Sequence, residues 1–214
     1  AFPSLSNDAW IKANSEIEPQ RLHALGVISF RWNTSEQLLF ALFAELLGLP
    51  RLEVQIIAHG LGNFDLIDRI RTFSSIRLKD DQSLIGLIEH AMSVYDRCRQ
   101  NRNQITHFDI HIALGEERSS GFNLVRRRKK PDQDPKPFDD RLQTLRRVAK
   151  EIWRLNARLK NLCERVSAKM RPEAAATWPK WRQQMVALPL EPLRLPELLS
   201  QTVRQERPPI NHPP

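Results

Sequence analysis

Apolar residues recur at steps of three and four along four long stretches of the chain, which is the spacing of one face of an α-helix. The stretches span about residues 18–47, 51–73, 80–107 and 139–168. The clearest apolar face, in the last stretch, consists of Leu142, Leu145, Val148, Ile152, Leu155, Leu159, Leu162 and Val166. No apolar run approaches the roughly 20 residues of a membrane helix. The pattern predicts an all-α fold, an up-and-down four-helix bundle.

Polar and glycine positions indicate where these helices begin, end or weaken. Residues 48–50, Gly-Leu-Pro, end the first helix, because glycine closes helices and proline does not continue them. Residues 33–36 are polar and leave open a break within that helix. Gly60 and Gly62 weaken the middle of the second helix. The polar residues 80–83 offer several caps for the third helix.

Two segments depart from the helical pattern. Residues 108–125 contain turn residues between two short apolar runs, 111–114 and 122–125, and predict a small hairpin-like insertion. From residue 172 onward, nine prolines in 43 residues oppose long helices and strands. We therefore divide the chain into a helical bundle domain, residues 1–171, and a Pro-rich extended tail, residues 172–214, with one or two short helices. The tail docks either on the bundle or on a partner.

Charge is unevenly distributed along the chain, whose net charge is +8. Residues 1–96 carry eight Lys and Arg against 12 Asp and Glu, whereas residues 97–165 carry 18 against nine. A basic segment of this kind attracts polyanions, and nucleic acid is the first candidate. The alternative is a solvated basic helix face without a ligand.

Other classes of site have little support in the residues. Cys98 and Cys163 are the two cysteines, and each lies in a predicted helix far from the other, so neither a disulfide framework nor a metal site is indicated. The chain has seven glycines and no glycine-rich phosphate loop. We predict no metal and no cofactor. The first residues lack the basic and apolar regions of a signal peptide, so we expect a cytoplasmic protein with no membrane partner.

The candidate chemistry lies at the end of the third helix, where Arg102 and Asn103 are followed by His107. Arginine binds phosphate through a planar fork of donors. Histidine transfers protons near neutral pH. Asn103 and His107 are four residues apart and therefore neighbours on one helix face. An arginine, an amide and a histidine are sufficient to cleave a phosphodiester without a metal.

The environment of Arg102 is open to two interpretations. It follows Cys98 by four residues on the apolar face, where an unpaired arginine is rare. Either it pairs with an inward carboxylate such as Glu89 or Asp96, or it faces a cleft that phosphate enters. Arg102 and His107 point about 140° apart on an ideal helix. They converge only if the arginine curls around, the helix distorts, or the cleft lies across a dimer axis.

An arginine with asparagine directly after it and histidine five residues on, at the end of a core helix in a basic bundle, resembles the HEPN superfamily (higher eukaryotes and prokaryotes nucleotide-binding domain). The helical layout over residues 20–168 is similar, while the specific motif covers six residues. The resemblance implies a metal-independent endoribonuclease of toxin–antitoxin or antiviral defence systems. It also implies a homodimer with the active site at the dimer interface, RNA as substrate and an antitoxin protein as a possible partner.

The resemblance also assigns roles to residues. Arg102 binds the scissile phosphate, Asn103 orients the phosphate or the histidine, and His107 transfers the proton of the ribose 2′-OH or of the leaving oxygen. The product ends in a 2′,3′-cyclic phosphate. One departure is Asp109, where some HEPN toxins have a tyrosine that an antitoxin modifies; the one tyrosine of this chain is Tyr95. The alternatives are a non-catalytic HEPN-like module that binds RNA or nucleotides and a protein-interaction module.

A second basic element follows the predicted hairpin. Five adjacent cations would suit docking on an RNA backbone, with a solvated loop or a contact to an acidic antitoxin as the alternatives. These cations are Arg126, Arg127, Arg128, Lys129 and Lys130. Arg99 precedes Asn103 by four residues and is predicted to extend the same phosphate-facing surface.

Overall fold

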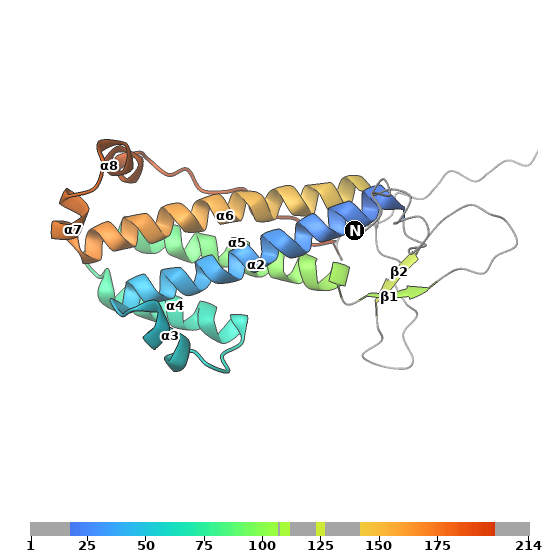
Figure 1. Ribbon diagram of the computed structural model, residues 1–214, viewed down its shortest axis with the longest axis horizontal. Helices are drawn as coiled ribbons and strands as arrows, with labels where there is room; N and C mark the ends of the chain where they lie inside the picture. Colours follow the sequence, from blue (N-terminus) through green and yellow to red (C-terminus); the bar gives the residue numbers. More distant parts are fainter. Residues whose placement is uncertain (1–17, 107, 112–122, 127–141, 200–214) are drawn as a thin grey trace, which may run out of the picture.

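The computed structural model describes residues 18–106 and 142–199 and the backbone of residues 108–111 and 123–126. Long helices pack against one another along a common axis, with a two-stranded hairpin at one end and the short helices of the tail at the other (Figure 1). The all-helical bundle is thus confirmed. Within the described residues, no helix combines the length and apolarity needed to cross a membrane.

The first helix, α2 (Pro19–Leu47), is continuous, and the break left open at residues 33–36 does not occur. Ser35 is fully buried there, and its hydroxyl donates to Asn156 Oδ1 at 2.5 Å. The polar residue thus fastens α2 to the last long helix rather than interrupting it. Gly48 ends α2 in the left-handed conformation, with φ of 72°, which glycine adopts without steric cost.

The single second helix predicted over residues 51–73 is wrong. The segment forms a short helix, α3 (Arg51–Ile57), and a longer one, α4 (Asn63–Arg77). Gly60, at φ of 81°, lies in the connection between them, where a left-handed residue cannot continue a helix. Asp65 Oδ2 accepts the N–H of Gly62 at 3.3 Å and helps to start α4. Gly60 and Gly62, which were predicted only to weaken the middle of one helix, therefore lie where the segment divides into two helices.

The third and fourth predicted helices are confirmed with small shifts at their ends, as α5 (Gln82–Thr106) and α6 (Leu142–Met170). Asp81 caps α5, because its Oδ1 accepts the N–H of Leu84 at 3.0 Å. The hairpin consists of β1 (Phe108–His111) and β2 (Asn123–Arg126), paired antiparallel with Phe108 opposite Arg126. Its first strand begins three residues earlier than predicted.

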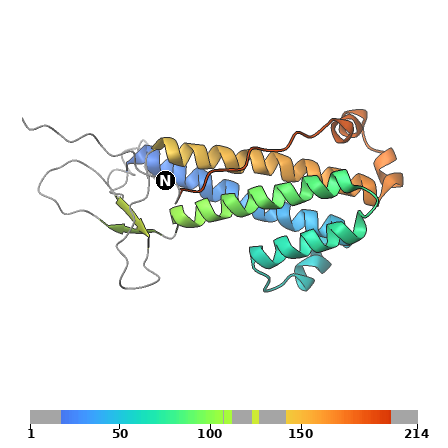
Figure 2. The same ribbon diagram turned by 180° about the vertical axis from the view of Figure 1, so that it is seen from behind.

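The directions of the long helices do not follow the simple alternation of an up-and-down bundle. Contacts of Glu36 with Asn63 and of Leu47 with Arg77 show that α2 and α4 run parallel, because α3 and its connection return the chain to the middle of the bundle. The α2–α6 pair is parallel too, while α5 runs against all three (Figures 1 and 2). Since α4 is shorter than its neighbours, it covers α2 and α5 only in the half of the bundle far from the hairpin.

The described part of the tail contains two short helices, where one or two were expected: α7 (Pro172–Ala176) and α8 (Lys180–Ala187). The extended segment that follows, residues 188–199, is called the strap below. It returns along the bundle beside α5 and α6 (Figure 2). Leu190, Leu193 and Leu199 pack against the core, and Pro196 is buried. Of the two docking options, this part of the tail takes the bundle of its own chain.

Candidate functional site at the end of α5

Arg102 and Asn103 lie side by side in the last turns of α5. Nη1 of Arg102 donates to Oδ1 of Asn103 at 3.1 Å. The guanidinium carbon is 5.9 Å from the ring centre of Trp32, a buried residue of α2. The indole thus supports the cation from the neighbouring helix, at the long end of the range for cation–π attraction. The arginine and the amide of the motif form one unit, as a joint role at a phosphate requires.

The two carboxylates proposed from sequence as partners of Arg102 are both engaged elsewhere. Glu89 Oε2 accepts from Nε of Arg71 at 3.0 Å. Asp96 Oδ1 accepts from Arg99 at 2.7 Å. Within the part of the chain that the structure describes, Arg102 has no ion pair with a carboxylate. Its Nε is buried and has no hydrogen-bond partner there, so this donor is not satisfied by the described residues.

Arg99 is less available than predicted. Its Nε and Nη2 both donate to Oδ1 of Asp96, at 3.0 and 2.7 Å. The pair is only partly exposed, with side-chain exposures of 26% for Arg99 and 31% for Asp96. A phosphate would therefore compete with a carboxylate for this guanidinium. The structure places Arg99 one turn before Arg102, as part of an ion pair rather than as a free cation.

Tyr95 lies beneath the arginines on the same face of α5. Its ring centre is 4.9 Å from that of Trp32, and its buried hydroxyl has no partner among the described residues. Burial raises the pKa of Tyr95 well above its usual value, and Glu36 adds to this effect, while Arg99 and Arg102 oppose it. The phenol therefore stays protonated at neutral pH and is a hydrogen-bonding group, not a phenolate.

Glu36 links this cluster to two helices. Its Oε1 accepts from Nε1 of Trp32 at 2.9 Å and from Nδ2 of Asn63, the first residue of α4, at 2.7 Å. The carboxylate thereby fixes the indole on which the guanidinium of Arg102 rests. The acid nearest to Trp32 is committed to neutral donors and does not neutralise the arginine.

The remaining predicted site residues lie outside the described residues. These are His107, the side chain of Arg126, and Arg127, Arg128, Lys129 and Lys130. The described part of α5 ends at Thr106, whose hydroxyl donates to the carbonyl of Arg102 at 3.1 Å. The convergence of Arg102 and His107 therefore stays a prediction.

Sequence reasoning missed Asn101, the residue directly before the motif. It is fully buried, its Nδ2 donates to the carbonyl of Glu197 at 3.0 Å, and its Oδ1 accepts the N–H of Leu199 at 3.1 Å. Both halves of the amide thus bind the backbone of the strap. The available signal was an amide three residues after Cys98 on the buried face of the helix, where an unpaired polar group is costly.

His90 has a similar structural role nearer the start of α5. Its Nε2 lies 2.6 Å from the carbonyl oxygen of Leu193 and donates to it. Arg158 and Arg165 of α6 donate to the carbonyls of Glu191 and Leu188. The strap is therefore bound through its backbone from both helices, and its end lies against the turn that carries Arg102.

No cluster of three or more His, Cys, Asp or Glu side chains suited to a metal ion occurs in the described part of the chain. The arrangement that is present is a cation and an amide in a half-buried position, beside a protonated phenol. Such a set can bind and orient a phosphate. Proton transfer at neutral pH needs a further group, for which His107 is the candidate.

Comparison of the chain with protein family models, with curated proteins and with solved structures finds no match. The resemblance to the HEPN superfamily accordingly depends on the motif and the helical layout alone.

Proposed function

We propose that this protein is a metal-independent endoribonuclease of HEPN type. The observation that supports the proposal is the state of Arg102: it is hydrogen-bonded to Asn103, supported by Trp32, and free of a carboxylate among the described residues. A structural arginine on a core face would be neutralised by an acid. An arginine that binds a phosphate is not neutralised by an acid, because its charge is needed for the ligand.

In the proposed reaction, the ribose 2′-oxygen attacks the adjacent phosphorus and the bond to the 5′-oxygen breaks. His107 of one subunit takes the proton of the 2′-OH, and His107 of a second subunit gives a proton to the leaving 5′-oxygen. Arg102 stabilises the negative charge that accumulates on the phosphoryl oxygens, and Asn103 orients the phosphate. The products are a 2′,3′-cyclic phosphate and a 5′-hydroxyl.

The proposal includes a homodimer whose two motifs face one cleft, because the motif supplies one histidine per chain and the reaction uses both an acid and a base. A toxin or a defence effector in the cytoplasm, restrained by an antitoxin protein, is the biological setting that the resemblance favours. DNA is not a substrate under this mechanism, since it lacks the 2′-hydroxyl nucleophile.

The test is cleavage of a mixed-sequence RNA in EDTA, with wild type, His107→Ala and Arg102→Ala purified in parallel and product ends analysed. We expect wild type to leave cyclic phosphate. His107→Ala should be slower by about 10²–10⁴-fold, as for loss of a general acid or base. Arg71→Ala is the matched control, because it removes an arginine whose partner, Glu89, lies outside the motif; it should cleave like wild type.

Two results would contradict the proposal. Equal cleavage by wild type and His107→Ala would assign the activity to another group or to a contaminant. RNA retention by wild type without any cleavage would make the bundle a binding module. Circular dichroism of each variant establishes that loss of activity is not loss of fold.

A further inference from the structure

One exposed face of α6 carries cations on either side of a tryptophan. Arg146, Lys150, Trp153 and Lys160 are all exposed and follow one another by four, three and seven residues, so they form a single stripe along the helix. The stripe is about 21 Å long at the helical rise of 1.5 Å per residue. Ala157, also exposed, occupies the remaining position of the stripe and leaves it flat beside the indole.

The charge of this stripe is not compensated in the described part of the chain. Arg146, Lys150 and Lys160 have no ion pair or hydrogen bond with another described side chain. The two carboxylates of α6 do not neutralise these cations. Glu164 is the next position of the stripe after Lys160, but it binds Arg182 of α8. Glu151 lies near Arg147 and Cys98, towards α5. The cations therefore face solvent as a group of one sign.

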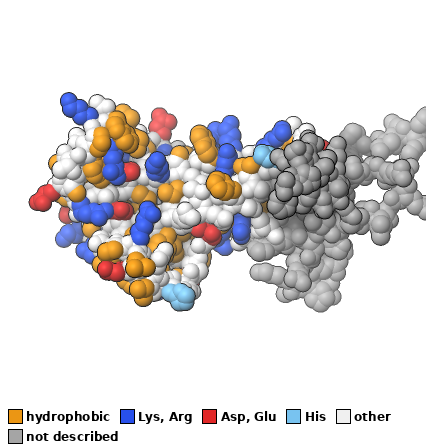
Figure 3. Space-filling model, viewed as in Figure 1, with side chains coloured by type: hydrophobic (Ala, Val, Ile, Leu, Met, Phe, Trp, Pro, Cys, Tyr) orange, Lys and Arg blue, Asp and Glu red, His pale blue; other side chains and the backbone are white. Residues whose placement is uncertain are grey.

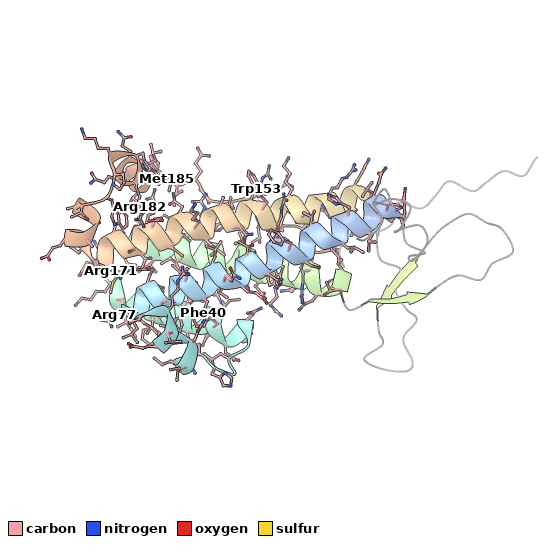
Figure 4. All side chains as sticks on the ribbon, in the orientation of Figure 1. Phe40, Arg77, Trp153, Arg171, Arg182 and Met185 are labelled. Carbon is pink, nitrogen blue, oxygen red and sulfur yellow. The ribbon has the colours of Figure 1, made fainter. Side chains whose placement is uncertain are left out.

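Trp153 distinguishes this stripe from an ordinary solvated face. Its side chain is 55% exposed and lies on the outer side of α6 (Figure 4). In the space-filling view, Lys and Arg side chains gather around an apolar side chain along this part of the molecule (Figure 3). An exposed indole among cations combines a surface for base stacking with charges for phosphates. A lone tryptophan offers too little apolar area to hold a helix in a lipid interface.

We propose that this face of α6, defined by Arg146, Lys150, Trp153 and Lys160, binds single-stranded RNA. The cations contact successive parts of the phosphate backbone, and an unpaired base stacks on the indole. Double-stranded RNA does not fit, because its bases are already stacked within the helix. The choice of RNA among polyanions rests on the proposed function; the surface itself is separate from the motif in α5.

The test is fluorescence anisotropy with a labelled 12-nucleotide single-stranded RNA at several salt concentrations. All proteins carry His107→Ala, so that the RNA stays intact. The first variant combines Arg146→Gln, Lys150→Gln and Lys160→Gln. Its matched control, Arg71→Gln with Lys169→Gln and Arg194→Gln, removes the same charge from cations that are paired with Glu89, Asp81 and Glu197. Trp153→Ala is compared with Trp181→Ala, which removes another exposed indole, from α8.

We expect the α6 triple variant to bind at least about ten-fold more weakly and to lower the slope of log K against log salt by about 2, as for three lost phosphate contacts on a single strand. Trp153→Ala should weaken binding at least about five-fold. Both controls should stay within about two-fold of the parent. Equal losses in the α6 and control triples, or in Trp153→Ala and Trp181→Ala, would overturn the proposal.

Binding and cleavage can fail separately. If wild type does not cleave RNA while the α6 variants still lose binding, the proposed nuclease is wrong and the α6 surface stands. If wild type cleaves and the α6 variants bind like their controls, the nuclease stands and this surface is wrong.

Discussion

Arg102 shows how far single residues can be interpreted from sequence. Its place on the apolar face of α5 predicts that it is either neutralised or held for a ligand, and sequence cannot choose between them, because it does not show which partner each acid takes. The structure decides by giving Glu89 to Arg71 and Asp96 to Arg99. The acids are taken by partners on α4 and on α5 itself, and only the first of these depends on tertiary packing.

Glu151 is a second residue whose state is set by its surroundings. Its Oε2 is buried without a partner among the described residues. Burial raises the pKa of Glu151, and the nearby charge of Glu197 in the strap raises it further. Arg147, Arg154 and Arg194 act in the opposite direction. The folded state therefore binds a proton more tightly than the unfolded state, and the free energy of unfolding falls as pH rises through the raised pKa.

Replacement of Glu151 by Gln should remove this fall in the free energy of unfolding, because the amide carries no charge at any pH. We expect Glu151→Gln to melt at a higher temperature than wild type near pH 7. The two melting temperatures should converge below about pH 4.5, the ordinary pKa of the carboxyl. Thermal denaturation by circular dichroism between pH 4 and 8 is the measurement. A constant difference across that range would show that the effect is not ionisation.

At the scale of elements, glycine positions explain both the successful and the failed predictions. Gly48 ends α2 where the sequence places the end, and Gly60 lies in the break between α3 and α4 that the sequence pattern bridges. The apolar spacing continues across the break, because α3 and α4 both present apolar residues to the same core. Periodicity alone therefore does not reveal the change of direction, which occurs at the left-handed backbone of Gly60.

Two glycines of α2 should respond oppositely to alanine. Gly26 is inside the helix with no atom within 4 Å of an added Cβ, so Gly26→Ala should stabilise the protein by about 0.5–1 kcal/mol. Gly48 has equal space but φ of 72°, so Gly48→Ala should destabilise it by about 1–2 kcal/mol. Urea denaturation of both variants measures the difference. Two shifts of the same sign would contradict the conformational explanation.

At the scale of the whole molecule, the strap connects the tail to the motif. Asn101 and Glu197 are 96 residues apart in sequence, yet the amide of Asn101 binds the strap backbone from within the core. Leu190, Leu193 and Leu199 add apolar contacts. The prolines predict an extended tail, and the strap is extended. Its backbone carbonyls are therefore free to accept hydrogen bonds from His90, Asn101, Arg158 and Arg165.

A double-mutant cycle tests this connection. Asn101→Ala in the full chain should cost about 1–3 kcal/mol, because it leaves a part-buried carbonyl and a buried N–H without partners. In a chain that ends at Ala187 the same substitution should cost little, since both partners are absent. Urea denaturation of the four proteins gives the coupling. Equal costs in the two backgrounds would show that Asn101 acts within α5 and not through the strap.

The sequence by itself determined the helical class, the ends of α2 and α5, the hairpin and the motif residues, because periodicity, caps and turn residues act over a few positions. Only the tertiary structure decided the parallel course of α2 and α4, the pairing of Glu89 with Arg71 and the position of the strap. These depend on contacts between residues from 18 to more than 100 positions apart, which no local pattern records.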